Sequence, residues 1–265
     1  PIESIKMIGD IHMLKKLFVA VTLTSLSGAV FADESAGLPW GLSLSGAAAI
    51  STDYRFRGIT QTDTDPAIQA GFSLIHPSGL YAGLWGSNVN FGVDTPHLEL
   101  DPSFGYSRTL ETLSSKPIVD VGVLYYSYPS ASELNWAELY AKLSFKNKLL
   151  EGDYLFTNLN YSNDYAGVGA DSWNLNMAYS APLASSGFSG LIGVGYSVVD
   201  EDKYSFNGDD HYLDWKAALS YSFKSVSGAT AELAAIGTNL ETKGLSDAAK
   251  RGIETGAVFT LSKAF

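Results

Sequence analysis

The chain has 265 residues and a formal net charge of −11, with 26 glycines, 15 tyrosines, 13 phenylalanines and no cysteine. The lack of cysteine excludes a disulfide framework, a thiolate metal site and a cysteine nucleophile. The acidic balance argues against a nucleic-acid partner, because such partners are bound by clustered lysine and arginine.

The first recognisable element is the stretch "MLKKLFVAVTLTSLSGAVFADESAG". Lys15 and Lys16 precede an apolar run, which the small residues of "AVFA" follow. This order is that of a secretory signal peptide, whereas a membrane anchor needs a longer apolar run of about 20 residues. We therefore expect a signal peptide over 13–32 and export of the chain.

The predicted signal peptide sets the other boundaries of the chain. Residues 1–12 precede a natural start at Met13 and are expected to be an upstream translation artefact. Residues 33–265 then form the mature domain, and none of its segments is apolar for long enough to be a transmembrane helix. A periplasmic, a secreted and an outer-membrane protein remain possible classes.

The mature chain alternates apolar and polar residues with the period of two that is typical of strands. In "DSWNLNMAYS", Trp173, Leu175, Met177 and Tyr179 alternate with polar residues and one alanine. Twelve segments show this pattern, near 42–57, 66–76, 80–91, 97–107, 117–128, 134–145, 149–162, 170–180, 189–199, 210–223, 227–238 and 251–265.

A soluble periplasmic sandwich also alternates, so other features must decide the fold class. The apolar faces carry aromatic residues at their ends, such as Tyr54, Phe56, Trp173 and Tyr179. The strand count is even, and short turns such as "PSG" and "KNK" alternate with longer polar loops. These features are typical of outer-membrane barrels. We predict an all-β fold, a closed antiparallel transmembrane β-barrel of about twelve strands, with both termini in the periplasm.

The last predicted strand runs to the end of the chain in "TGAVFTLSKAF". Ala257, Phe259, Leu261 and Phe265 share one face of this strand. We expect Phe265 to close the barrel against the first strand. A terminal phenylalanine on an alternating strand also resembles the signal that the outer-membrane assembly machinery recognises, so that machinery is a predicted partner.

The register of the first predicted strand assigns its charged side chains to the lumen. Placing Arg55 in lipid would cost roughly 2–4 kcal/mol at mid-depth, so odd positions face inward and even positions, including Tyr54 and Phe56, face lipid. The same logic applies to the other strands. The predicted pore-lining residues are Asp53, Arg55, Arg57, Glu99, Asp101, Asp120, Glu138, Lys142, Asp214, Lys216 and Glu232.

Two interpretations of these charges remain open. They line a narrow channel for ions or small polar solutes, or they form salt bridges that fill a closed lumen. In the channel interpretation the excess of inward acids predicts a weak cation preference, which Arg55 and Arg57 could reverse at the outer mouth. In the other, the barrel is non-conducting and has a structural or receptor role. Outer-membrane lipid and lipopolysaccharide are then partners in either case.

The mature chain shows no catalytic or metal-binding sequence pattern. Its histidines, His76, His97 and His211, lie at predicted strand ends, and no G-x-S-x-G element is present. The acidic loop "DEDKYSFNGDD" lacks the spacing of a calcium loop. We predict no enzymatic activity, no metal site and no cofactor.

Two motifs, "STDYRFRGITQTDTDPAIQAGF" and "SGLYAGLWGSNVNF", resemble the TorF (Gcw_chp) family of exported bacterial proteins, to which a porin role is attributed. Its S-D-Y-x-x-R-G-x-x-Q element corresponds to Asp53, Tyr54, Arg57, Gly58 and Gln61, with Thr52 inserted. "VGVLYYSYP" and "HYLDWKAALSYSF" match further along the chain. The resemblance implies an outer-membrane barrel and offers no catalytic residues.

Overall fold

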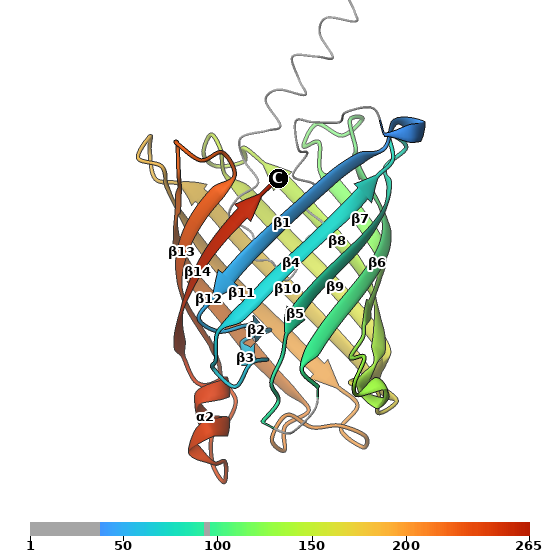
Figure 1. Cartoon of the computed structure of the whole chain (residues 1–265), viewed down its shortest axis with the longest axis vertical. Coiled ribbons are helices and arrows are strands. Elements are labelled where there is room, and N and C mark those ends of the chain that lie inside the picture. The colour runs from blue at the N-terminus through green and yellow to red at the C-terminus, as the bar shows by residue number, and fades with distance from the viewer. Residues whose placement is uncertain (1–37, 93–95) are drawn as a thin grey trace, which may run out of the picture.

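In the computed structural model of the protein, residues 38–92 and 96–265 are described, so the predicted signal peptide and residues 1–12 lie outside the described residues. Within those ranges, twelve antiparallel strands form one closed barrel (Figure 1). The strands are β1 (Ser43–Ser51), β4 (Ala67–Ile75), β5 (Leu80–Asn88), β6 (Leu98–Thr109), β7 (Ile118–Tyr126), β8 (Trp136–Lys146), β9 (Tyr154–Tyr165), β10 (Ala170–Pro182), β11 (Phe188–Val199), β12 (His211–Ser222), β13 (Ala229–Thr238) and β14 (Gly256–Ala264).

Each of the twelve predicted segments overlaps one of these strands, so the predicted fold class is confirmed. Several strand ends differ by a few residues, and two differences are larger. The segment predicted to run over 42–57 leaves the barrel wall after Ser51, and helix α2 (Asp247–Ile253) precedes the last strand. The described residues also form two short 3-10 turns, η3 (Pro39–Gly41) and η4 (Ser132–Leu134). No helix of the described residues is long and apolar enough to cross a membrane.

The barrel closes between its first and last strands. β1 pairs with β4 on one side and with β14 on the other, where Ser51 lies opposite Thr260. The backbone N–H of Phe265 donates to the carbonyl of Gly46 at 2.9 Å, and the N–H of Gly46 donates to the carbonyl of Phe265 at 3.0 Å. The terminal residue is therefore held in the sheet, as its alternating strand predicted.

The two faces of the wall differ in chemistry. Outward side chains are apolar and accessible, with Ile50, Ile68 and Ile192 between 60% and 70% exposed. Inward side chains are mostly serine, asparagine, charged residues and tyrosine, and many of them are buried. An apolar exterior around a polar interior is the distribution expected of a barrel that lipid surrounds.

The two ends of the barrel also differ. The described ends of the chain, near Pro39 and at Phe265, lie at the end that we call the terminal end (Figure 1). Short connections lie there, and the connections at the opposite, loop end are longer, except for 166–169. The connections at the terminal end span 76–79, 110–117, 147–153, 183–187 and 223–228. Those at the loop end span 52–66, 89–97, 127–135, 166–169, 200–210 and 239–255.

Asp153 organises the turn between β8 and β9. Its carboxylate accepts hydrogen bonds from the backbone N–H groups of Lys148 and Leu149 at 2.7 Å and of Leu150 at 2.8 Å. The hydroxyl of Tyr179 donates to it at 3.0 Å. Burial alone would raise the pKa of Asp153, but these hydrogen bonds favour the ionised form more strongly and lower the pKa below its ordinary value.

Replacing Asp153 with asparagine should therefore destabilise the barrel by about 1–2 kcal/mol at neutral pH, because the substitution removes a charged acceptor from several donors. Urea unfolding followed by tryptophan fluorescence measures this. Since the folded pKa is lowered, the stabilisation is present above the ordinary aspartate pKa and is lost as the pH falls through the lowered one. Glu151→Gln, at an exposed position of the same turn, is the control. Equal stability of the two variants at neutral pH would refute the role of Asp153.

Candidate functional site in the barrel lumen

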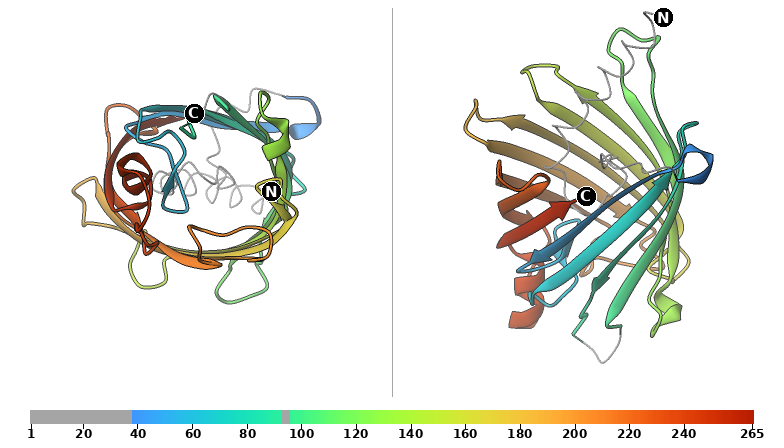
Figure 2. Two further views of the ribbon diagram at one scale, coloured as in Figure 1. Left: turned by 90° about the horizontal axis from the view of Figure 1, so that it is seen from below. Right: turned by 45° about the horizontal axis from the view of Figure 1, so that its top comes forward.

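After β1 the chain turns into the lumen and forms a small hairpin. Strands β2 (Arg55–Phe56) and β3 (Ile59–Thr60) pair with each other and not with the wall. We call residues 52–66 the lumenal hairpin; it lies inside the ring of strands when seen from the loop end (Figure 2). Arg57 and Gly58 have positive φ angles of 49° and 84°, which suits the tight two-residue turn of a hairpin.

Aromatic contacts attach the lumenal hairpin to one side of the wall. Tyr54 packs edge-on against Trp85 of β5, and Phe56 packs edge-on against Tyr126 of β7, with ring centroids 5.3 and 5.5 Å apart. Tyr126 stacks on Trp136 of β8 at 4.1 Å. The prediction that Tyr54 and Phe56 face lipid is therefore wrong: Tyr54 is 4% exposed and belongs to a buried lumenal cluster.

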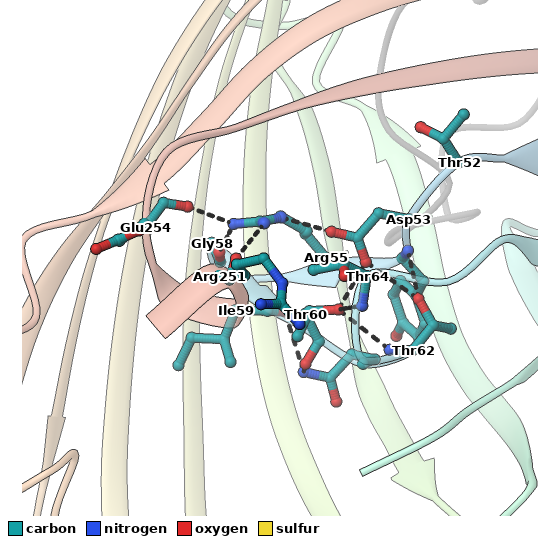
Figure 3. A network of polar contacts seen from close by, with 12 residues as sticks. Thr52, Asp53, Arg55, Gly58, Ile59, Thr60, Thr62, Thr64, Arg251 and Glu254 are labelled. Atoms are coloured by element: carbon teal, nitrogen blue, oxygen red, sulfur yellow. Dashed lines mark hydrogen bonds and ion pairs between the residues drawn. The ribbon is translucent and has the colours of Figure 1, made fainter. Parts of the chain in front are cut away.

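Arg55 joins the hairpin to helix α2 (Figure 3). Its Nε donates to Asp53 Oδ2 at 2.7 Å, Nη1 donates to the carbonyl of Glu254 at 2.7 Å, and Nη2 donates to the carbonyl of Arg251 at 2.9 Å. Asp53 also accepts a hydrogen bond from the hydroxyl of Thr60 at 2.6 Å. Both charged side chains are thus engaged by protein groups that fix the hairpin.

Arg57 extends across the lumen. Its Nη2 donates to Glu138 Oε1 on β8 at 2.6 Å, and both side chains are less than 10% exposed. On another side, the hydroxyl of Tyr212 on β12 donates to the Arg57 carbonyl at 3.1 Å. Strands β8 and β12 are not neighbours in the wall, so the turn of the hairpin spans part of the lumen and narrows it.

Beside the hairpin, one row of inward residues crosses six strands. Residues opposite each other in successive strand pairs form this lumenal row. It consists of Asp120, Lys142, Asn158, Asn176, Gly195 and Asp214, on strands β7 to β12 in that order. The row combines three of the predicted pore-lining residues with two amides and a glycine that the charge pattern did not single out.

Each inward basic residue among the predicted pore-lining set has an acidic partner. The pairs are Arg55–Asp53 at 2.7 Å, Arg57–Glu138 and Lys216–Glu232 at 2.6 Å, and Lys142–Asp120 at 4.0 Å. Among the described residues, no lysine or arginine lies within ion-pair distance of the three remaining acids, Glu99, Asp101 and Asp214. The lumen is therefore acidic overall.

The hairpin and four residues of the row, Lys142, Asn158, Asn176 and Asp214, line a lumenal cavity of about 210 Å³. Of the eleven predicted pore-lining residues, seven line it and four do not. The seven are Arg55, Arg57, Asp101, Glu138, Lys142, Asp214 and Lys216, and the other four are Asp53, Glu99, Asp120 and Glu232.

The cavity is not lined by the histidines, and the described residues form no candidate metal site there. His76, His97 and His211 are exposed, and none of them lines it. In the described part of the chain, no group of three histidine, aspartate or glutamate residues is placed to hold a metal ion.

The model of a family described as "Bacterial protein of unknown function (Gcw_chp)" matches residues 35–265. The chain belongs to the Gcw_chp family. No curated protein sequence matches the chain.

Solved structures similar to this Gcw_chp protein include outer-membrane barrels. NanC porin, in a rhombohedral crystal form, has a TM-score of 0.54 and 13% identity, over 84% of this chain and 98% of that chain. KdgM porin follows with a TM-score of 0.49 and 10% identity, over 83% and 99%. The outer membrane protein OpdK of Pseudomonas aeruginosa has a TM-score of 0.43 and 12% identity, over 86% and 67%. The similarity to NanC agrees with the closed barrel fold.

A second narrowing of the Gcw_chp barrel comes from two tyrosines. Tyr81, Gly105, Gly122 and Tyr140 lie opposite one another across β5 to β8. The two tyrosine hydroxyls contact each other above the glycines, and that of Tyr81 also donates to Asp120 at 2.7 Å. Sequence alternation placed these tyrosines on strands but gave no reason to pair them.

Proposed function

We propose that the protein is an outer-membrane porin, a passive diffusion channel for ions or small polar solutes. The observation that carries this proposal is a closed barrel with an apolar exterior and a cavity in its lumen lined by charged and polar residues. The porin names of similar structures, NanC and KdgM, support it. The lumenal hairpin and the Tyr81–Tyr140 pair make the path narrow, so small solutes are favoured over large ones.

The acidic balance of the lumen supports a preference for cations. Asp101 and Asp214 line the cavity without a basic partner, and carboxylates at a constriction lower the barrier for cations. The test is the reversal potential of the channel under a potassium chloride gradient. We expect it to favour potassium, and the double substitution Asp101→Asn with Asp214→Asn should move it towards zero.

Glu111→Gln is the matched control for this experiment. Glu111 lies at the terminal end, is exposed and pairs with Lys116 at 2.9 Å, so its neutralisation removes one carboxylate charge outside the lumen. A reversal potential that shifts equally in the control and the lumenal variant, or that favours chloride in the unmodified protein, would contradict the selectivity argument.

The proposed location implies further partners. Outer-membrane lipid and lipopolysaccharide would contact the exposed apolar side chains of the wall. The assembly machinery would recognise the last strand, whose Phe265 is 54% exposed. A passive channel needs no catalytic residue and no cofactor, in keeping with the absence of a predicted catalytic motif.

A second candidate function is a non-conducting barrel with a structural or receptor role. The observation that favours it is the hairpin itself, because Arg57 spans the lumen and aromatic residues fill the space between hairpin and wall. A folded barrel that carries no current would support this candidate over the channel.

A further inference from the structure

Asparagine side chains on the inner face of the wall form a chain of hydrogen bonds. Asn158 Nδ2 donates to Asn160 Oδ1 at 3.0 Å, and Asn160 Nδ2 donates to Asn174 Oδ1 at 3.1 Å. Asn174 Nδ2 donates in turn to the hydroxyl of Ser197 at 2.7 Å. Asn174 Nδ2 also donates to the backbone carbonyl of Tyr196 at 3.4 Å, and because a carbonyl can only accept, this bond sets the orientation of Asn174 and, through the shared bonds, of the other amides.

This chain determines how Asn176 is oriented. The nitrogen of Asn174 donates to the Tyr196 carbonyl and to Ser197, so Asn174 offers Asn176 only an oxygen, and Asn176 Nδ2 donates to that oxygen. Asn176 Oδ1 therefore points away from Asn174 and lies over Gly195. There it meets Asp214 Oδ2, and both oxygens lie under 3.0 Å from the position that a Cβ atom on Gly195 would occupy.

The lumenal row thus presents acceptors without matching donors. Asp214 Oδ2 and Asn158 Oδ1 are buried and accept no hydrogen bond from the described residues. The nearby cationic side chains are paired elsewhere, Arg57 with Glu138, and Lys216 with Glu232. Buried acceptors that lack a donor are unfavourable, so a ligand that brings N–H donors and a positive charge is stabilised here.

We propose that the lumenal cavity binds a small solute with a primary ammonium group, held by Asp214 Oδ2 and Asn176 Oδ1. An ammonium group carries three N–H donors and no acceptor, which complements converging oxygens. The cavity of about 210 Å³ is smaller than the roughly 300–1,000 Å³ of pockets for drug-sized ligands, so the solute is small. As the solute class of the proposed channel, this inference rests on the proposed function, although binding is measurable without conduction.

The surroundings of the site keep binding weak. The hairpin turn packs against Asp214, because a Cβ on Gly58 would lie 3.0 Å from the Asp214 Cβ, and Arg57 lines the same cavity. Lys142 and Lys216 also face the cavity from β8 and β12. Weak binding agrees with passage, since a solute must leave the site as well as enter it.

The test is an NMR titration of the purified full barrel in detergent with methylammonium chloride as the probe. Asp214→Asn should weaken binding by about tenfold or more, as expected for a lost charge-assisted hydrogen bond. Gly195→Ala should weaken it similarly, because the methyl group occupies the space where the two oxygens converge. Tetramethylammonium, which has the charge but no N–H donor, should bind about tenfold more weakly than methylammonium.

Gly193→Ala is the matched control, since Gly193 lines the cavity on the same strand and the nearest atom to an added Cβ would be 3.3 Å away. It should bind methylammonium like the unmodified protein. If Asp214→Asn does not fold, Asn176→Ala replaces it, with the same expected loss. Unchanged methylammonium binding in the folded Asp214 or Asn176 variant, or equal affinity for tetramethylammonium, would overturn the proposal.

Bilayer recordings on the same samples separate this inference from the proposed function. Methylammonium binding by an electrically silent barrel would support the site and refute the channel. A conducting barrel that binds no methylammonium would support the channel and refute the ammonium site.

Discussion

Replacing Arg57 with alanine should raise the single-channel conductance of the barrel several-fold. The Arg57–Glu138 ion pair, at 2.6 Å, holds the turn of the lumenal hairpin across the lumen. Removing one partner of a buried pair leaves the other charge uncompensated, at a cost of about 3–5 kcal/mol. That cost falls on the hairpin, whose strands β2 and β3 do not pair with the strands of the wall. Single-channel recording in a planar bilayer measures the conductance of the lumen once the hairpin is released.

Arg108→Ala is the control for the Arg57 substitution. Arg108 is exposed at the end of β6, where its side chain donates to the Tyr106 hydroxyl at 3.5 Å, so its loss should leave the conductance unchanged. Adding Glu138→Gln to the Arg57 variant should recover part of the lost stability while keeping the conductance high, because the buried charge is removed as well. A conductance that Arg57→Ala leaves unaltered would show that the current does not pass the hairpin.

Gly122→Ala should prevent normal assembly of the barrel or destabilise it strongly. A Cβ at this position would lie 2.5 Å from the carbonyl oxygen of Phe104 and 2.7 Å from the Tyr140 ring carbon that bears the hydroxyl. The carbonyl belongs to the neighbouring strand and cannot move without breaking the sheet. Overpacking of this kind costs about 1–3 kcal/mol and occasionally more. Heat-dependent gel mobility and urea unfolding measure the effect.

Gly193→Ala again provides the comparison, because its added methyl group meets no atom closer than 3.3 Å. It should migrate and unfold like the unmodified protein. If Gly122→Ala were as stable as the unmodified protein, the conclusion that the contact between Tyr81 and Tyr140 requires glycine at position 122 would be refuted.

The number and order of the strands followed from the sequence because each wall strand has one apolar and one polar face. The same rule failed at Tyr54 and Phe56, since alternation continues through the lumenal hairpin and a chain that leaves the sheet does not change its period. The turn of the hairpin lies at Arg57 and Gly58, which both have positive φ angles. Because arginine rarely adopts a positive φ, the sequence did not indicate a turn there. Helix α2 has seven residues, too few to show a helical period.

Part of the candidate site could also be predicted from the alternation of apolar and polar residues along the strands. Alternation predicted Asp101, Asp120 and Asp214 on the inner face, because charged residues are costly in lipid, and Asp101 and Asp214 line the lumenal cavity. The lumenal row could not be predicted, since it depends on the register between strands, which connections of different lengths and a bulge between β9 and β10 set. Asn158 and Asn176 are uncharged and far apart in the chain, so only the paired strands bring them together.

Recording of single channels from the purified barrel under a potassium chloride gradient tests the central claim most directly, with heat-dependent gel mobility used to verify folding. The proposed function predicts discrete, small current steps with a reversal potential that favours potassium. A barrel that is folded by its mobility and remains electrically silent would contradict the channel and leave the structural or receptor role in its place.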